Sequence, residues 1–312
     1  MLLLGFAAPH TNAADARPRT FDVAVYTGQA IELYDVGSKS SIAIPCKIPV
    51  EYLSVAPSGH FLVISSRASE AGMGQLYLLN VAAGSFRQLT SKPFYFKALG
   101  PGERELYSDP EVSPDSRSVA FAVHAVAGND SDDLVGLAGP LAVMNIHSGE
   151  RRVLRATENV AGQGTAYVNS PAWSSDGRRL LVAFEAGGAV AGLEGRDLQL
   201  LDGLMMKPFS EGVTSPLGWW SSTEIFFVWN PEQISGLGKL FLLNLREGGI
   251  RNATDALQVP DAYLRDVTGI DVNSRFSLVR HGSDAELFSR SGQLIRRWPT
   301  CKARLRPSSA AL

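Results

Sequence analysis

The chain has 312 residues, of which 45% are hydrophobic and 19% charged, so it carries enough apolar side chains for a buried core and is not a disordered chain. Twenty-nine basic and thirty-one acidic residues leave a formal charge of −2, which provides no field for a polyphosphate and disfavours nucleic acid as a partner. Length alone allows one domain or two, because all-β domains often exceed about 200 residues.

Residues 1–16 resemble an export signal. Met1 to Ala8 is apolar and uncharged, and Asn12 to Ala16 supplies small residues suited to cleavage. The apolar run is short and follows no lysine or arginine, so a frayed terminus is the alternative. The sequence predicts a periplasmic or secreted protein with no membrane span, with a signal peptide over 1–16, one folded domain over 17–306 and a tail over 307–312.

Three β-forming runs follow, at Phe21–Tyr26, Ile31–Asp35 and Ser41–Ile44. They are predicted as the second, third and fourth strands of a blade whose innermost strand is missing locally. A late segment around Cys301–Arg306 is a candidate for that strand, because folded proteins avoid open sheet edges. A C-terminal segment that hangs free is the alternative.

From Glu51 onwards, a polar turn followed by a run of β-formers occurs five times, which predicts five copies of one hairpin. The copies are anchored on turns at Pro57, Pro114, Ser175, Ser221 and Val272. Their spacings of 57, 61, 46 and 51 residues lie within or just beyond the roughly 40–50 residues of a propeller blade. The prediction is an all-β fold, a single β-propeller of about six four-stranded blades, with N- and C-terminal strands sharing one blade.

The blade around Ser175 is predicted from four β-forming runs. They are Ala172–Trp173, Arg179–Phe184, Asp197–Leu201 and Lys207–Ser210, with 186–196 as a loop between the second and third. The connections between second and third strands, and those between blades, are longer than the others. Both kinds emerge on one face of an up-and-down blade, and this face is the predicted binding face.

Two copies carry a recognisable motif. Pro110-Glu111-Val112-Ser113-Pro114-Asp115 and Pro171-Ala172-Trp173-Ser174-Ser175-Asp176-Gly177 resemble the WD40-like repeat of the TolB family, and Phe86-Arg87-Gln88-Leu89-Thr90 resembles its ending. The resemblance covers most of Glu51 to Thr300 and implies an extracytoplasmic TolB-like propeller. TolB proteins carry an α/β domain before the propeller, for which this chain has no room. The resemblance therefore does not extend to their role in the Tol envelope system.

The polar residues of this motif have a predicted structural role. Asp115 and Asp176 fall in tight turns, where a carboxylate accepts backbone N–H groups, and Gly177 can adopt a positive φ. A catalytic role for these carboxylates is the less favoured alternative.

Aromatic residues are the candidate binding residues. Tyr95, Phe96 and Tyr107 lie in the most aromatic connector, and a loop that folds these rings onto the propeller is the alternative. Trp219 and Trp220 lie on a predicted inner strand, where one of them would face the central channel and stack on a ligand. Packing between blades is the commoner use of such a large ring.

Cys46 and Cys301 are the only cysteines, near opposite ends of the chain. One alternative is a disulfide between them that closes the ring. The other is two unpaired thiols, because equivalent positions on adjacent blades are farther apart than the roughly 7 Å between Cα atoms that a bridge allows. Residues 129–133 (Asn-Asp-Ser-Asp-Asp) form an acidic cluster that is favoured as a solvated loop tip over a calcium site. A basic cluster is favoured as a solvated tail over a site for an acidic partner; it comprises Arg296, Arg297, Lys302, Arg304 and Arg306.

Local enzyme motifs are absent: the sequence has no Gly-x-Ser-x-Gly, His-Glu-x-x-His, Walker or Cys-x-x-Cys pattern. The predicted function is therefore non-catalytic binding of a protein, peptide or glycan through the loop-rich face, without cofactor or metal, by a monomer. The alternative is a propeller hydrolase or lyase acting on a polysaccharide or peptide in the central channel. It requires groups such as His124 and Asp266 to converge near the axis.

Overall fold

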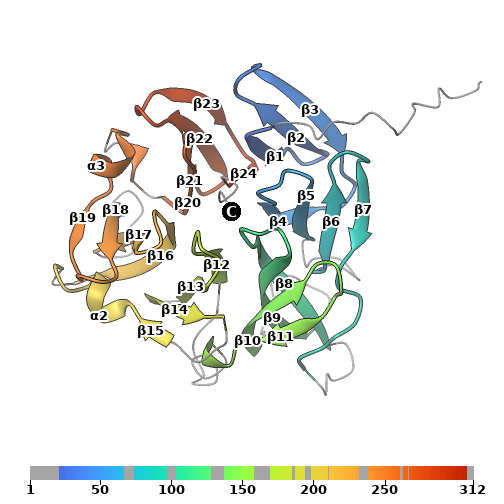
Figure 1. The fold of residues 1–312 in the computed structure, drawn as a ribbon, viewed down its shortest axis with the longest axis horizontal. Coiled ribbons are helices and arrows are strands. Elements are labelled where there is room, and N and C mark those ends of the chain that lie inside the picture. Colours follow the sequence, from blue (N-terminus) through green and yellow to red (C-terminus); the bar gives the residue numbers. More distant parts are fainter. Residues whose placement is uncertain are drawn as a thin grey trace, which may run out of the picture.

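The chain forms a ring of six four-stranded antiparallel sheets, a six-bladed β-propeller (Figure 1). The computed structural model describes residues 21–66, 74–96, 103–127, 137–157, 169–184, 187–193, 198–209, 211–231, 238–260, 263–265 and 267–307. The short helices α2 (Asp202–Met205) and α3 (Thr254–Leu257) follow outer strands. The predicted all-β propeller with six blades is confirmed.

Each blade runs from an inner strand near the axis to an outer strand at the rim. The inner strands are β24 (Lys302–Leu305), β4 (Val50–Val55), β8 (Glu103–Val112), β12 (Asn169–Trp173), β16 (Val213–Trp219) and β20 (Gly269–Val272). The second strands are β1 (Val23–Tyr26), β5 (Phe61–Ser66), β9 (Ser118–Ala127), β13 (Arg179–Phe184), β17 (Glu224–Asn230) and β21 (Phe276–His281). The third strands are β2 (Ala30–Asp35), β6 (Leu76–Asn80), β10 (Leu137–Asn145), β14 (Gly187–Gly192), β18 (Lys239–Asn244) and β22 (Asp284–Ser289). The outer strands are β3 (Ser40–Pro45), β7 (Ser85–Gln88), β11 (Arg151–Val153), β15 (Leu198–Leu200), β19 (Ile250–Asn252) and β23 (Leu294–Trp298).

The apolar core lies between the blades. Side chains alternate along a strand, so the sheet of each blade presents apolar residues on both of its faces. Phe226 of β17, for example, packs toward β20–β23, whereas its neighbour Phe227 packs toward β12–β15. Six such clusters occupy the interfaces among the described residues, one for each pair of adjacent blades. Each blade is therefore stabilised by both neighbours, which requires the ring to be closed.

A repeated turn joins the third and fourth strands of three blades. Asn80, Asn145 and Asn244 each accept backbone N–H bonds on the side-chain oxygen, from a residue three positions later among others. A glycine four positions after each asparagine has φ between 61° and 72°. This face of the ring also carries the turns between first and second strands, and we call it the turn face; the opposite one is the loop face.

Asp115 and Asp176 occupy equivalent turns on the turn face. Each carboxylate accepts the hydroxyl of the serine two positions earlier at 2.6 Å and the N–H two positions later at 3.0 Å. Gly177 has φ +68°, and Ser116 adopts φ +59° at the matching position. The geometry agrees with the predicted structural role of these residues.

Replacing Gly177 by alanine is expected to destabilise the fold by about 1 kcal/mol, because an L-residue is strained at this φ although an added Cβ would make only ordinary contacts with Pro114. Gly249→Ala is the matched control, since Gly249 has no positive φ and nothing within 4 Å of an added Cβ. Urea unfolding of both variants measures the difference. Equal losses in the two variants would contradict the role assigned to the turn.

The ring is closed by β24, which pairs with β1 at the opposite end of the sequence. Val23 faces Leu305 and Tyr26 faces Lys302 in an antiparallel register. One late strand and three early ones thus form a single blade, as the missing inner strand predicted. In Figure 1 the red β24 lies beside the blue β1 next to the centre of the ring.

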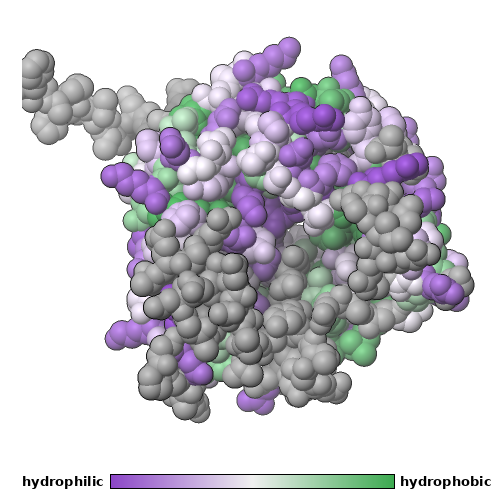
Figure 2. Space-filling view, turned by 180° about the vertical axis from the view of Figure 1, so that it is seen from behind, coloured by the Kyte–Doolittle hydropathy of each residue, from purple (hydrophilic) through white to green (hydrophobic). Residues whose placement is uncertain are grey.

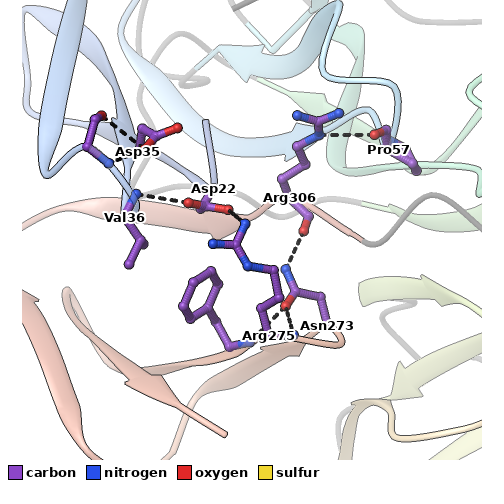
Figure 3. A network of polar contacts seen from close by, with 9 residues as sticks. Asp22, Asp35, Val36, Pro57, Asn273, Arg275 and Arg306 are labelled. Atoms are coloured by element: carbon purple, nitrogen blue, oxygen red, sulfur yellow. Dashed lines mark hydrogen bonds and ion pairs between the residues drawn. The ribbon is translucent and has the colours of Figure 1, made fainter. Parts of the chain in front are cut away.

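Arg306 extends this closure to the neighbouring blades (Figure 3). Its guanidinium donates to the carbonyls of Pro57 at 3.0 Å and Ser58 at 3.1 Å, and its backbone N–H donates to Asp22 at 2.7 Å. Its own carbonyl accepts a bond from the Asn273 side chain at 2.9 Å. Three blades are therefore tied together at one residue.

The blade around Ser175 differs from the prediction. Its third strand is β14 (Gly187–Gly192) and its fourth is β15 (Leu198–Leu200), whereas 207–209 forms no strand. The segment Gly-Gly-Ala-Val-Ala-Gly has weak β propensity, yet it is buried as a strand. A glycine is needed at 188 because the side chain of Pro216 from the next blade leaves no room for a Cβ there. Tertiary packing overrides the local signal here.

Cys46 and Cys301 are both buried free thiols, so the structure contains the unpaired alternative. Cys46 belongs to the core between the closing blade and β4–β7, and Cys301 to the core between that blade and β20–β23. The closing sheet thus separates them. Burial raises the pKa of both thiols, that of Cys301 to about 11, which keeps them protonated at neutral pH.

Candidate functional site

The aromatic connector before β8 is anchored on one buried carboxylate. Glu105 is 2% exposed and accepts the backbone N–H groups of Phe94 at 3.1 Å, Tyr95 at 3.1 Å and Phe96 at 3.0 Å. The Tyr107 hydroxyl donates to Oε1, the oxygen that also accepts the Phe94 N–H, at 2.8 Å. Three consecutive amides on one anion fix the path of this segment as it reaches the ring.

Tyr107 is therefore a core residue, and its predicted role in partner contact is wrong. It lies in β8 rather than in a connector, is 2% exposed, and packs edge-on against Phe121. Phe94 stacks on Tyr107, so part of the connector folds its aromatic rings onto the propeller, as the alternative to a contact surface proposed. Tyr95 and Phe96 remain half-buried, in edge contact at 4.8 Å, and stay the candidate contact residues.

Tryptophans link the inner strands of successive blades. The indole of Trp219 donates to the Ala172 carbonyl at 2.8 Å, and the indole of Trp173 donates to the Glu111 carbonyl at 2.9 Å. Trp220 packs edge-on to Phe226 in the next interface, with the Arg290 guanidinium 4.4 Å above its ring. Trp219 and Trp220, the two candidates for stacking on a ligand, thus make contacts between blades, which is the alternative role given for them above.

One position in each inner strand forms a ring around the axis. In every blade, one backbone N–H just after the inner strand donates to a carbonyl at the start of the second strand, as Ser113 does to Ser118 and Arg306 to Asp22. The residue that we consider lies two positions before this donor. The repeated bond places the six residues at the same level. We call them the channel ring: Arg304, Ser54, Glu111, Ala172, Gly218 and Asp271.

Asp271 is the centre of the charged part of this ring. Its carboxylate pairs with Arg280 at 2.7 Å and Arg304 at 3.1 Å and accepts the Leu305 N–H at 3.0 Å. Burial alone raises the pKa of Asp271, but the two guanidiniums outweigh it and hold the pKa below its ordinary value. Arg304 also donates to the Leu53 carbonyl at 3.0 Å. The arginine from the closing strand thereby links the two blades that flank its own.

Glu111 lies beside this pair and behaves differently. Burial raises its pKa to about 7, although Arg304 opposes the shift; the charge of Asp271 adds to it. The Ser54 hydroxyl bonds to its carboxylate. Glu111 is the ring carboxylate whose charge changes near neutral pH, and sequence reasoning did not single it out.

His124 contacts Ser108, with 2.9 Å between Nε2 and Oγ. The Ser108 hydroxyl donates to Asp109 at 2.8 Å, so its proton is not directed at the imidazole. Burial lowers the pKa of His124 to about 4, which keeps it neutral. This arrangement does not activate the serine, because the imidazole is not placed to accept its proton. Asp266, the other residue of the catalytic alternative, lies outside the described residues, as does the acidic cluster 129–133.

The basic cluster near the C-terminus is not a solvated tail. Arg304 and Arg306 make the ring-closing bonds described above. Arg296 lies over Tyr34 and pairs with Glu32 at 3.3 Å. Arg297 pairs with Glu286, and Lys302 lies 3.6 Å from Glu51. The prediction failed because these residues belong to the outer strand β23 and to the closing strand β24 with its exit, where their side chains pair with other strands.

The two faces of the ring differ. The described turns of the turn face are tight and stabilised by asparagine and aspartate side chains. Viewed from the side opposite to Figure 1, the surface is hollowed at the centre of the ring, and hydrophilic side chains border part of the opening (Figure 2). Asp271 and Arg304 keep one fifth of their side-chain surface exposed. The fold and the ring together define a β-propeller with a charged central channel.

Solved structures contain the same fold. TolB from Acinetobacter baumannii superposes with a TM-score of 0.59 at 12% identity, over 92% of this chain and 67% of that one. A chain of a nidogen/laminin complex gives 0.57 at 10% identity, over 93% and 99%. An oligogalacturonate lyase in complex with manganese gives 0.53 at 11%, over 85% and 69%. No protein-family model and no curated protein sequence matches. The likeness is one of fold, shared by TolB and other β-propeller proteins.

Among the described residues, no helix is long and apolar enough to cross a membrane.

Proposed function

We propose that this protein is a non-catalytic propeller that binds a protein, peptide or glycan partner through its loop face. The observation that carries the proposal is the difference between the two faces. The turn face has short connections, several of them fixed by side-chain caps, whereas the connections of the loop face vary from two residues between β21 and β22 to sixteen between β19 and β20. Variable loops on a rigid scaffold are the usual place of a binding site.

The Glu105 anchor supports this assignment. It fixes the backbone at Tyr95 and Phe96, two half-exposed aromatic side chains, in a blade-to-blade connector of the loop face. Aromatic residues are enriched in interfaces, and a fixed backbone lowers the entropy cost of binding. We further propose that the protein acts outside the cytoplasm, as the predicted signal over 1–16 implies.

The alternative is a hydrolase or lyase that acts on a polysaccharide or peptide in the channel. The fold is compatible with it, since one similar structure is an oligogalacturonate lyase. The site gives it less support, because Ser108 is hydrogen-bonded to Asp109 rather than activated by His124.

A photo-crosslinking amino acid at Tyr95 is expected to capture a defined partner from the envelope fraction of the host, whereas the same probe at Arg246 on the turn face is not. Arg246 is the matched control because it is exposed on a fixed turn. Tyr95→Ala together with Phe96→Ala is expected to weaken binding of the purified partner at least tenfold, with an unchanged melting temperature. Equal crosslinking from both faces would refute the proposal.

A further inference from the structure

The blade β16–β19 ends at the loop face in a row of side chains that lies beyond its core. On the side that packs against β12–β15, one row pairs Phe227 with Phe241. The next row toward the loop face pairs half-buried Trp229 with exposed Lys239. Arg265, also exposed, extends this row, because it forms a bridge with Lys239 from the connector before β20. Residues directly opposite one another point to the same side of a sheet, so an indole and two cations lie side by side. We call these three residues the end row.

The indole of Trp229 is held in place by the connector before β16. Phe209 stacks on it, with 4.4 Å between ring centroids and 10° between ring planes. The indole N–H donates to the Glu211 carbonyl at 2.8 Å. Gly212 has φ +117°, and a Cβ there would come within 2.7 Å of the indole nitrogen. Because the single N–H of the indole is already used, Trp229 offers a partner only apolar surface.

The two cations of the end row are not neutralised. In the part of the chain that the structure describes, neither Lys239 nor Arg265 forms an ion pair, and Glu211 in the adjacent connector pairs with neither. The Arg265 backbone is fixed, since its carbonyl accepts Nδ1–H of His281 at 2.9 Å. Like charges directly opposite one another destabilise a sheet. An anion placed between them removes this cost.

We propose that the end row binds an acidic segment of a polypeptide partner, with a carboxylate between Lys239 and Arg265 and a neighbouring apolar side chain on Trp229. Guanidinium and carboxylate groups form strong paired hydrogen bonds, and tryptophan and arginine are the residues that most often dominate binding energy at protein interfaces. The inference deepens the proposed function and rests on it, because the end row lies on the loop face.

The donors of the end row fit a carboxylate better than a sugar. Lysine and arginine side chains donate hydrogen bonds and accept none, and the indole N–H of Trp229 is occupied. A sugar hydroxyl both donates and accepts, so sugar hydroxyl groups would find no side-chain acceptor in this row. A carboxylate only accepts, and its charge complements the two cations.

The probe is a fluorescein-labelled hexapeptide of alternating glutamate and phenylalanine, titrated with the full chain at pH 7 and followed by fluorescence anisotropy. Saturable binding is expected to weaken about tenfold in the double variant Lys239→Ala, Arg265→Ala, and by a similar factor when glutamine replaces glutamate in the peptide. Serine in place of phenylalanine is expected to weaken binding about fivefold, because nothing then covers the indole. Arg117→Ala, Arg178→Ala is the matched control, since it removes two exposed cations from the turn face.

Absence of peptide binding would overturn the inference, and so would equal weakening in the two double variants, which would indicate general electrostatic attraction. Tighter binding of a uronic-acid disaccharide than of the peptide would assign the end row to an acidic glycan instead. The double variant Lys239→Ala, Arg265→Ala is expected to keep its melting temperature, because both side chains are exposed and the bridge between them is made by the backbone.

The two proposals fail separately. Peptide binding is measured on the purified protein and does not depend on capture of a partner from the host. Crosslinking at Tyr95 without peptide binding leaves the proposed function standing and removes the end row from it. Peptide binding without crosslinking at Tyr95 leaves the end row as the binding site of the loop face.

Discussion

A chain that ends at Thr300 is expected to lose cooperative unfolding and to expose apolar surface, whereas one that ends at Pro307 is expected to unfold like the full chain. Removal of 301–312 deletes β24, which pairs with β1 and also bonds to the two flanking blades through Arg304 and Arg306. Its loss leaves β1 as an unpaired inner edge and opens one inter-blade core. Each interface depends on its neighbours, so the damage is expected to spread around the ring.

Thermal unfolding followed by circular dichroism, together with binding of a hydrophobic dye, measures the effect. The shorter deletion, 308–312, is the matched control because it keeps every described bond of the closing strand. A chain ending at Thr300 that melted in one transition within a few degrees of the full chain would show that the closing strand is not needed for the fold.

Asp271→Ala is expected to destabilise the protein by roughly 3 kcal/mol at pH 7, because it leaves two enclosed guanidiniums and the Leu305 N–H without their acceptor. The value is set at the lower end of the range for buried ion pairs, since one fifth of Asp271 is exposed. Glu224→Gln is the matched control and is expected to cost less than about 1 kcal/mol, because its partner Arg251 is 45% exposed.

The sign of the pH dependence gives a second test of the same variant. The pKa of Asp271 is lowered in the fold, so its contribution to stability is fully present above the ordinary value of 3.8 and is lost as pH falls through the folded value. The difference between wild type and Asp271→Ala in urea unfolding is therefore expected to shrink in acid. A difference that stayed constant from pH 7 to pH 3 would show that the fold does not lower the pKa of this carboxyl group.

The closing blade could be predicted from sequence because it follows from a local count. Three β-forming runs before the first polar turn lack an inner strand, and an open edge has a physical cost, so the late segment around Cys301–Arg306 was the natural donor. The strand 187–192 could not be found in the same way. Its Gly188 is required by the close approach of Pro216, a contact between blades that no local propensity contains.

The channel ring was missed for a reason of register. Glu111 and Asp271 stand at matching positions of two repeats and could have been aligned with each other. The repeat that contains Trp219 and Trp220 does not align with them directly, because its register differs by one residue. The hairpin at Trp219 is one residue shorter, since Trp219 faces Ile225 whereas Trp173 faces Leu180. Arg304 belongs to no repeat, because its strand has no hairpin partner in sequence. Only the closed ring brings these residues to one level.

The use of the last strand to complete the first blade also sets an order of events during biosynthesis. The partner of β1 is synthesised only after the other five blades, so β1–β3 must wait with one edge unpaired while those blades emerge. During that interval the nascent chain presents a strand edge open to pairing with other chains. Folding of the nascent chain is therefore expected to depend on factors that protect this edge until β24 has been synthesised.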